Sequence, residues 1–407
     1  MNLLIIVNWY PPDIKVPARR WGNLVAYLQQ AGHTCTVISA GDGKPETYTS
    51  TAGEKVIRVS ISNKEIVKGK SELAIKPKMS AKQRLKDYFL RTIPSSFIRA
   101  PYDYWKATLQ NAPGVLEIAR QSDFIISSYG PMGPFLAGMW LAKKTNKKWV
   151  ADIRDAFESK GAGKFLLARK LDRYNEKQIL KKAFLRITVG ETLANYLSKQ
   201  YKQKFIAIYN GWSNLDKLPS RILDNKNNPY LYYAGTIYQH QIHSLSVLLD
   251  SLQEFPQLKL IIRLLKDSTG GELNALLERC NQSNQIIIWP PAPFETIEEE
   301  LIKSAGVVVI ESLDSSDELR NGTVTGKLLG LLVSGIPGIA VVSKNCEITK
   351  LVQKSNGWFS VDCVDDCIKA IKKVLEEQKL VDNSELLEDL HMKRQALKLV
   401  NELRNNR

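Results

Sequence analysis

Cysteine, histidine and long apolar runs are all scarce in this chain of 407 residues. Its five cysteines are scattered and form no CxxC pair, which argues against a disulfide framework and a zinc site. No cluster of Cys, Asp or Glu accompanies His240 and His243, so we expect surface histidines and no bound metal. The thiols suit a reducing cytoplasm, and they belong to Cys35, Cys280, Cys346, Cys363 and Cys367.

No segment has the pattern of a signal peptide or a transmembrane helix. The opening MNLLIIVNWYPP lacks a basic flank and has only a short apolar run before Trp9 and Pro11, which predicts a first β-strand. Elsewhere no apolar run approaches the roughly 18 residues that a membrane span requires. We therefore expect a cytoplasmic protein.

Acidic residues are in the minority, because 42 Asp and Glu stand against 57 Lys and Arg, a formal net charge of +15. This charge indicates an anionic partner: nucleic acid, an anionic membrane or a phosphorylated substrate. Residues 64–106 hold eleven basic and four acidic residues beside aromatic side chains at close spacing. This pattern predicts contact with an anionic membrane surface, although a solvated basic face over core aromatics would look alike. No helix-turn-helix, finger or RNP-type pattern supports nucleic acid as a partner.

Short β-branched runs alternate with helical patterns, which predicts an α/β fold of two Rossmann-like domains with parallel sheets. The polar stretch 213–228 reads as a linker between an N-terminal domain, 1–212, and a C-terminal domain, 229–380. A helical tail follows at 381–407, with apolar spacing that includes Leu397 and Val400. The strands are expected near residues 3–8, 34–39, 56–61, 124–127, 149–152, 186–189, 205–208, 230–234, 258–262, 285–288, 307–310 and 338–342.

The stretch RNGTVTGKLLGLLVSGIP, residues 320–337, is the most informative part of the chain. A Gly- and Thr-rich loop runs into an apolar helix, whose first amides lack partners within the helix and carry the positive end of its dipole. Gly322 and Gly326 allow close approach of a ligand, Thr323 and Thr325 flank Val324 as hydroxyl donors, and Lys327 adds a charge. We predict a phosphate site here; the alternative is an ordinary capped helix with a solvated lysine.

This stretch resembles the donor-phosphate loop of GT-B-fold glycosyltransferases of family 4, whose pattern is close to GTVTGKLFEYLASGKP. The segment LYYAGTIYQHQ is similar to the family's FYTGTIYPGQ, at its first strand-to-helix turn in the donor domain. The resemblance implies that Gly235 and Thr236 approach the donor diphosphate together with residues 322–327. It also implies that the nucleotide-sugar is a substrate, that no separate cofactor is needed, and that the terminal helix crosses back to the first domain.

Two motifs in the first half extend the resemblance. NWYPPDIKVPARRWGNLVAYLQQAGH is similar to YPPxxGGxxRRWxxLxxxLxxxGH, with Lys15 and Val16 in place of the glycine pair. ADIRDAF resembles ADxRDPW. The resemblance implies acceptor binding by Arg19, Arg20 and Asp152 and catalytic roles for Arg154, Asp155 and Lys327. An exposed first turn for the arginine pair, and a structural ion pair within the second motif, are the alternatives.

The largest departure concerns two glutamates that retaining members carry eight positions apart, the second of which binds the nucleotide ribose. Gly322 and Gly330 stand at those positions here. Glu311 and Glu318 are close in sequence, and we expect Glu318, in the DSSDELRNG loop, to be the better placed substitute. A solvated loop acid is the alternative.

Taken with the charge pattern, the resemblance implies a retaining glycosyltransferase in surface polysaccharide synthesis. The enzyme would move a sugar from a nucleotide diphosphate to a lipid-linked or glycan acceptor, at the inner face of the cell membrane. Its two domains would face each other across a cleft. A nucleotide-sugar epimerase of the same fold, and a non-catalytic binding subunit that lost both glutamates, are the competing hypotheses.

Overall fold

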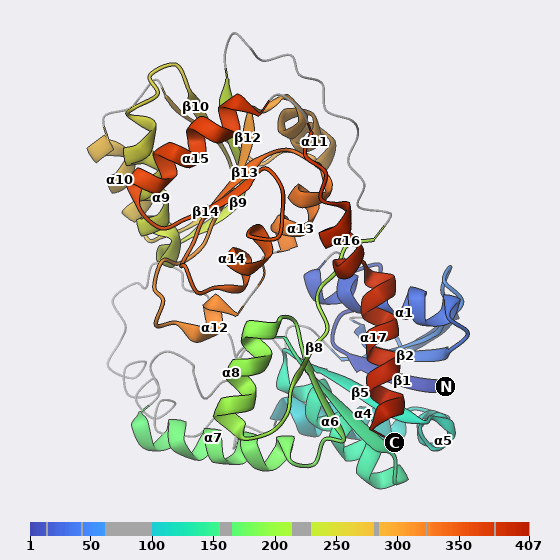
Figure 1. Cartoon of the computed structure of the whole chain (residues 1–407). Coiled ribbons are helices and arrows are strands. Elements are labelled where there is room, and N and C mark those ends of the chain that lie inside the picture. The colour runs from blue at the N-terminus through green and yellow to red at the C-terminus, as the bar shows by residue number, and fades with distance from the viewer. Residues whose placement is uncertain are drawn as a thin grey trace. The chain divides into compact units, whose positions relative to one another are not determined.

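The computed structural model describes residues 1–13, 15–41, 44–61, 100–154, 165–213, 229–280, 285–322, 324, 326–377 and 380–406. The chain forms two compact units (Figure 1). The first unit comprises Met1–Tyr209 and Met392–Arg407, and the second comprises Asn210–His391. Each unit contains a largely parallel sheet with helices, which confirms the predicted α/β class with two Rossmann-like bodies.

The first unit contains an eight-stranded sheet in the order β3-β4-β2-β1-β5-β6-β7-β8, parallel except for the β3 edge. Its strands are β1 Asn2–Val7, β2 Thr34–Gly41, β3 Glu46–Thr49, β4 Lys55–Ser60, β5 Phe124–Tyr129, β6 Lys148–Ile153, β7 Leu185–Thr188 and β8 Ile206–Ala207. Its described helices are α1 Val16–Gln30, α4 Ala100–Asn111, α5 Val115–Gln121, α6 Met132–Thr145, α7 Leu166–Leu180, α8 Glu191–Tyr201 and α17 Met392–Asn405.

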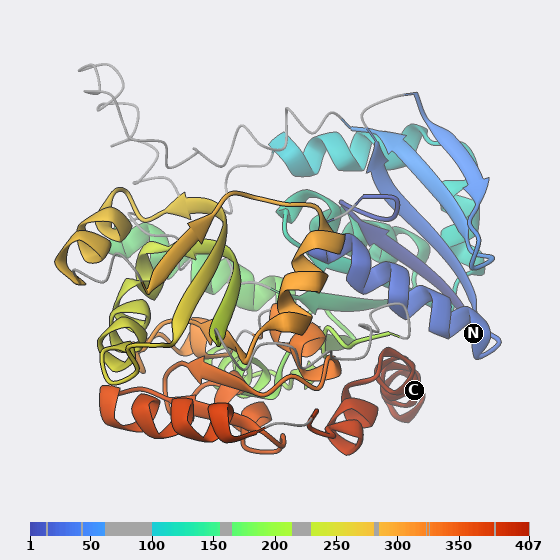
Figure 2. The same cartoon turned by 90° about the horizontal axis from the view of Figure 1, so that it is seen from above.

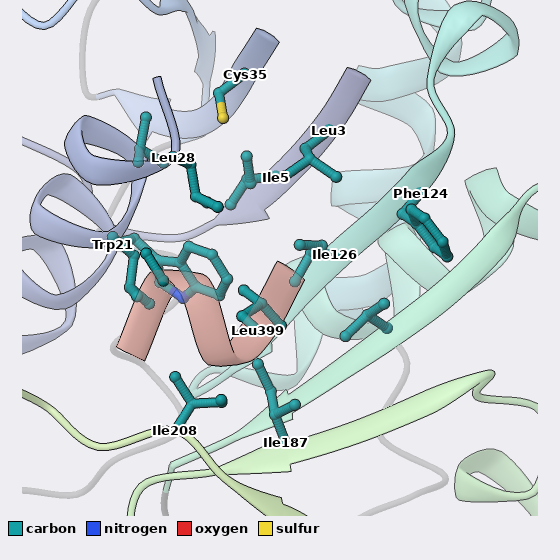
Figure 3. Packing of buried hydrophobic residues seen from close by; sticks show 14 of the residues in the cluster. Leu3, Ile5, Trp21, Leu28, Cys35, Phe124, Ile126, Ile187, Ile208 and Leu399 are labelled. Carbon is teal, nitrogen blue, oxygen red and sulfur yellow. The ribbon is translucent and has the colours of Figure 1, made fainter. Parts of the chain in front are cut away.

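Both faces of the first sheet are covered, which is why a strand such as β1, NLLIIV, is almost continuously apolar. Alternate β1 residues Leu3 and Ile5 pack under α1 and α17 in one buried cluster (Figure 3). On the other face α6 lies against β5, and a Cβ at Gly138 would be only 2.4 Å from the Ser127 Cβ. The two helices of the first face, α1 and α17, contact each other, and Figure 2 views α17 nearly end-on while α1 runs across the view (Figures 1 and 2).

The second unit contains a six-stranded parallel sheet in the order β11-β10-β9-β12-β13-β14. Its strands are β9 Tyr230–Tyr238, β10 Lys259–Ser268, β11 Ile286–Trp289, β12 Gly306–Ile310, β13 Gly338–Val341 and β14 Trp358–Val361. Its helices are η4 Gln239–Gln241, α9 Ile242–Leu252, α10 Glu272–Cys280, α11 Phe294–Lys303, α12 Glu318–Asn321, α13 Gly326–Val333, α14 Glu347–Val352, α15 Val364–Glu376 and α16 Ser384–Leu390.

Alternation along β9 again separates the two faces of its sheet. Leu231 and Tyr233 belong to the buried cluster that α9 and α15 share. Tyr232 points to the opposite face, where its hydroxyl donates to Glu300 of α11 at 2.7 Å. Two strands, β3 and β14, were not among the expected ones; each has four residues and lies at a sheet edge.

The tail expected as one segment, 381–407, consists of two helices in different units. Helix α16 belongs to the second unit and α17 to the first. The break falls at His391, whose backbone is extended and forms a bridge with Trp212 while the two rings pack edge to face at 4.7 Å. Within α17, Leu399 is fully buried, whereas Leu397, which the apolar spacing had included, is 44% exposed on another face of the helix.

We predict that Leu399→Ala destabilises the protein by about 2–5 kcal/mol, because it opens a cavity between α17, α1 and the first sheet. The matched control on the same helix, Leu397→Ala, removes a half-exposed side chain and is expected to change stability by at most about 0.5 kcal/mol. Urea unfolding of the full chain measures both. Equal losses in the two variants would contradict the assignment of α17 to the core of the first unit.

Candidate functional site

Arg20 and Asp152, two residues expected to bind an acceptor, instead form a fully buried ion pair in the first unit. The Arg20 Nη2 lies 3.1 Å from the Asp152 Oδ1, and neither side chain is exposed. Asp152 also accepts from the indole of Trp21 at 3.0 Å and from Ser128 at 2.7 Å. Because a ligand cannot reach either group, we assign the pair a structural role: it holds α1 against the carboxyl end of β6. The ion pair joins the ARRW motif to the ADIRDAF motif, whereas the structural ion pair considered from the sequence lay within ADIRDAF alone.

The other residues predicted in this half differ in their environment. Arg154 is buried, and its guanidinium donates to the Ser128 hydroxyl at 3.1 Å and to the Tyr129 carbonyl at 3.2 Å. Arg19 is exposed in the first turn of α1. Asp155 lies outside the described residues. Of the predicted acceptor and catalytic residues that are described in this unit, Arg19 is therefore the most open to a ligand.

In the second unit, Gly235, Thr236 and Lys327 come together at the carboxyl end of β9. The Lys327 Nζ donates to the Tyr233 hydroxyl at 3.3 Å and lies 4.7 Å from the centre of the Tyr233 ring. The same hydroxyl donates to the Thr236 carbonyl at 2.8 Å. Gly235 has φ +148°, and a Cβ there would lie 1.8 Å from the Lys327 Nζ. A side chain at position 235 would therefore displace the ammonium.

The electrostatics of Lys327 favour an added anion. Loss of hydration near Tyr233 lowers the pKa of Lys327, and the negative charge of Glu311 partly offsets this effect. Burial raises the pKa of Tyr233, and the Glu311 charge adds to that shift, so this phenol stays protonated and neutral. Among the residues that the structure describes, no carboxylate forms an ion pair with Lys327. An anionic ligand beside it would favour its charged form.

The loop before α13 is described only in part, at Gly322, Val324 and Gly326. Gly322 is buried and ends α12, and Val324 is 7% exposed. Gly326 begins α13, and a Cβ there would meet nothing within 4 Å. Thr323 and Thr325 lie outside the described residues. The described part of this loop therefore leaves the start of α13 open beside Lys327.

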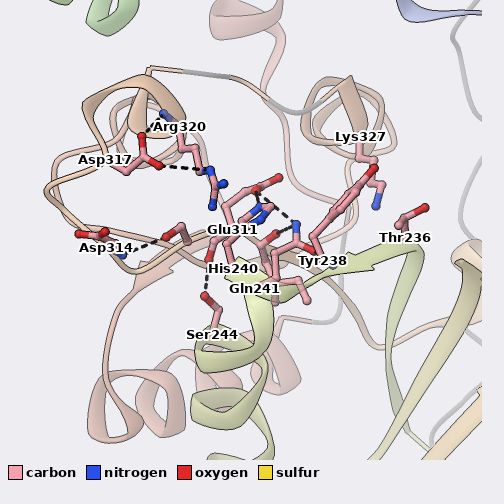
Figure 4. Close-up of polar contacts among 12 residues, drawn as sticks. Thr236, Tyr238, His240, Gln241, Ser244, Glu311, Asp314, Asp317, Arg320 and Lys327 are labelled. Atoms are coloured by element: carbon pink, nitrogen blue, oxygen red, sulfur yellow. Dashed lines mark hydrogen bonds and ion pairs between the residues drawn. The ribbon is translucent and has the colours of Figure 1, made fainter. Parts of the chain in front are cut away.

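Glu311, directly after β12, is the acid that this site contains. Its Oε2 accepts from Gln241 Nε2 at 3.2 Å and lies 3.6 Å from His240 Nε2 (Figure 4). Its backbone carbonyl accepts from the Ser244 hydroxyl. The side chains of Glu311 and His240 are 31% and 25% exposed, so the carboxylate is held in place and still reaches solvent.

Two expectations change with this arrangement. Glu318, expected to be the better placed acid, is exposed in the first turn of the four-residue helix α12. His240, expected on the open surface, is half-buried and stacks on Tyr238 at 5.6 Å between ring centres. Sequence reasoning missed Tyr233 and Gln241 as site residues. Both residues lie in the segment LYYAGTIYQHQ that the sequence analysis singled out. Their roles become visible only through their contacts with Glu311 and Lys327, which lie 70 and 94 positions away in the sequence.

Three potential metal ligands, Asp362, Cys363 and Asp366, lie together at the start of α15. Two of them already have cationic partners, since Lys344 is 3.1 Å from Asp362 and Lys369 is 3.1 Å from Asp366. We therefore assign no metal to this group. The described cysteine side chains, Cys35, Cys346, Cys363 and Cys367, are free thiols.

Most of the basic segment 64–106 lies outside the described residues, so its predicted membrane contact stays a prediction. Its end forms part of α4, where Trp105 is completely buried and belongs to the protein interior. No helix in the described part of the chain is long and apolar enough to cross a membrane.

Two glycines near the site should respond oppositely to alanine. Gly235→Ala forces a Cβ against Lys327 at positive φ, and we expect a loss of about 1–3 kcal/mol. Gly330 lies inside α13, and a methyl group added there would meet nothing within 4 Å, so Gly330→Ala should gain up to about 1 kcal/mol from helix propensity. Thermal unfolding compares the two variants. A stabilising Gly235→Ala would contradict the close packing of Lys327 on β9.

No protein-family model matches the chain, and comparison with curated proteins found no match. Solved structures match over the full length. A lipopolysaccharide outer core galactosyltransferase, WaaB, aligns with TM-score 0.58 and 11% identity, over 99% of each chain. The catalytic domain of starch synthase IV from Arabidopsis thaliana, bound to ADP and acarbose, aligns with TM-score 0.61 and 11% identity, over 100% of this chain and 99% of the other. TarM aligns with TM-score 0.57 and 12% identity, over 99% and 98%. This likeness establishes that the chain has the GT-B fold.

Proposed function

We propose that the protein is a glycosyltransferase that takes a sugar from a nucleotide diphosphate donor bound to its second unit. The observation that carries the proposal is the Lys327 ammonium held at the carboxyl end of β9 beside Gly235 and the start of α13. Ligands of open parallel sheets bind beyond the carboxyl ends of the strands. Two proteins of similar fold support it: WaaB is a galactosyltransferase, and the starch synthase domain binds ADP.

The donor diphosphate would lie between Lys327 and the first amides of α13. These amides have no partner within the helix, and Lys327 adds a full charge that packing on Tyr233 has already positioned. As the bond to the sugar breaks, negative charge grows on the leaving phosphate. Donors fixed in advance around that charge lower the barrier without reorganising. Gly235 contributes by leaving space for the ammonium.

Glu311 would bind hydroxyl groups of the donor, in place of the glutamates missing at positions 322 and 330. Its carboxylate is partly exposed and is close enough to Lys327 to influence that residue's pKa. Gln241 holds one of its oxygens, and His240 stands beside it as a second hydrogen-bonding group. A carboxylate with such neighbours suits a ribose or hexose diol, because a diol presents two hydroxyl donors.

The finer features of the reaction belong to the same proposal. We propose transfer with retention, to a lipid-linked or glycan acceptor in surface polysaccharide synthesis at the cytoplasmic face of the membrane. Exposed Arg19 is the acceptor-side cation we favour in the first unit. Asp155 and the segment 64–106 enter from the sequence alone, as a catalytic residue and a membrane contact.

The first test is a thermal-shift screen of the full chain with UDP, GDP, ADP and CMP and their sugar conjugates. A ligand at a hundred times its dissociation constant should stabilise the fold by about 2.7 kcal/mol. Lys327→Ala should weaken binding by roughly 1.5–3 kcal/mol, the value of a hydrogen bond to a charged group. The matched control is Lys373→Ala, which removes a lysine 5.3 Å from the Phe359 ring and should bind as the wild type does.

The pH dependence of binding tests the same assignment. Since the pKa of Lys327 is lowered, its ammonium loses its proton at a lower pH than an ordinary lysine near 10.4. Binding of the nucleotide by the wild type should therefore weaken as the pH rises toward the pKa of Lys327. The difference in binding free energy between the wild type and Lys327→Ala should shrink over the same change of pH. Calorimetry at several pH values measures this difference, in which titration of the ligand cancels. A difference that stays constant would count against Lys327 as the phosphate ligand.

Glu311→Gln keeps the size of the side chain and removes its charge. We expect weaker binding of the sugar nucleotide or slower turnover by at least about tenfold, equal to about 1.4 kcal/mol. Glu318→Gln is the matched control, because that acid is exposed on α12. Hydrolysis of the donor that the screen identifies provides the measurement. If Glu318→Gln impaired turnover and Glu311→Gln did not, Glu318 and not Glu311 would be the carboxylate that binds the donor.

A further inference from the structure

Helix α7 of the first unit exposes an unusual amount of apolar surface. Five large hydrophobic side chains are exposed at its start and through its first turns. They are Phe165 at 43%, Leu166 at 68%, Leu167 at 70%, Leu171 at 39% and Tyr174 at 61%. Single exposed leucines are ordinary, but a group of this kind on one element marks an interaction site.

The buried face of α7 contains the polar residues that a surface helix normally turns outward. Asp172 and Glu176 are 1% and 2% exposed, and they share this face with Ala168 and Leu180. Glu176 accepts a hydrogen bond from the Tyr201 hydroxyl of α8 at 2.7 Å. At about 100° per residue, the exposed leucines lie on the side opposite to these acids. The helix is thus amphipathic in the reverse sense, and its apolar face is outward.

The charges left on the outer surface of α7 are all positive. Both acids of the segment 165–182 are the buried ones. Of its basic residues, Lys170, Arg173, Lys181 and Lys182 are exposed, whereas Arg169 and Lys177 are half-buried. Lys170 lies between Leu166, Leu167, Leu171 and Tyr174 on the outward face, by the same helical spacing. The surface therefore combines leucines, a tyrosine and charges of positive sign.

We propose that α7 is a membrane-contact helix that lies in the interface of an anionic lipid bilayer. The leucines would enter the acyl boundary, Tyr174 would lie at headgroup depth, and the lysines and arginines would contact lipid phosphates. Charge complementarity decides in favour of lipid, because a neutral apolar partner would gain nothing from the four exposed basic residues. This surface is separate from the segment 64–106, and it goes beyond the proposed sugar transfer because it requires neither nucleotide nor acceptor.

Vesicle co-sedimentation of the full chain tests the proposal. The wild type should bind vesicles of equal parts phosphatidylcholine and phosphatidylglycerol, and bind pure phosphatidylcholine much more weakly. Leu166→Gln/Leu167→Gln should raise the lipid concentration for half-maximal binding by about tenfold or more, since each buried methylene contributes about 0.8 kcal/mol. Lys170→Glu/Arg173→Glu should have a similar effect, because each basic residue near an anionic surface contributes about 1 kcal/mol.

Matched controls lie in the second unit. Leu265→Gln/Phe294→Gln removes hydrophobic residues that are 65% and 64% exposed, and Lys354→Glu/Lys372→Glu reverses two exposed charges. Neither pair should alter vesicle binding. Thermal unfolding, with and without the nucleotide that stabilises the wild type, verifies that each α7 variant is folded. It also separates failure of this proposal from failure of the proposed function.

Three results would overturn the assignment. The first is unchanged vesicle binding in both α7 variants. The second is loss of binding only in Lys82→Glu/Arg84→Glu/Lys86→Glu, which would place the contact in the segment 64–106. The third is a change of oligomeric state in Leu166→Gln/Leu167→Gln, measured by light scattering, with vesicle binding intact. That result would make a second copy of the chain the occupant of this face.

Discussion

The ammonium of Lys327 lies where any residue other than glycine at position 235 would place its Cβ, 1.8 Å away. This contact brings the start of α13 against β9, and it allows the Tyr233 ring and hydroxyl to hold the ammonium. Packing, and not a carboxylate, therefore positions the charge in the described part of the site. A cation held in this way keeps its capacity for an external anion, whereas one already paired with an acid would have to give up that partner.

The proposed acid of the site differs in position from the family pattern that the sequence resembles. Positions 322 and 330 are glycine, and we propose that Glu311, directly after the neighbouring strand β12, provides the carboxylate. Glu311 is fixed by Gln241, whose amide also donates to the Ile310 carbonyl at 3.0 Å. The carboxylate thus belongs to the residue that directly follows an interior strand, and the Glu311 N–H still donates to the Val341 carbonyl of β13 at 3.1 Å, which holds this position more firmly than a free loop would.

The sequence predicted the alternation of strands and helices well, because buried parallel strands are short, nearly continuous apolar runs whose signal is local. It could not predict contacts between distant residues. Arg20 and Asp152 each belonged to a recognisable motif, but only the fold places one guanidinium 3.1 Å from the other's carboxylate and removes both from solvent. The partnership of Tyr233 with Lys327 is equally non-local. On α7, the direction in which the leucines point is also non-local, because it depends on where Asp172 and Glu176 find partners.

The division of the chain between the two units has a consequence for biosynthesis. Helix α17 is made after the whole second unit, yet Met392, Leu399 and Leu403 complete the core of the unit that is made first. During translation the second unit can form its own sheet and core while one face of the first sheet still lacks α17. Successive domains usually fold one after another from the N-terminus. Here the first unit cannot complete its folding before the second unit has been synthesised. The nascent first unit must wait for α17 to leave the ribosome, and a message truncated shortly before this helix would yield an intact second unit beside an unfinished first one.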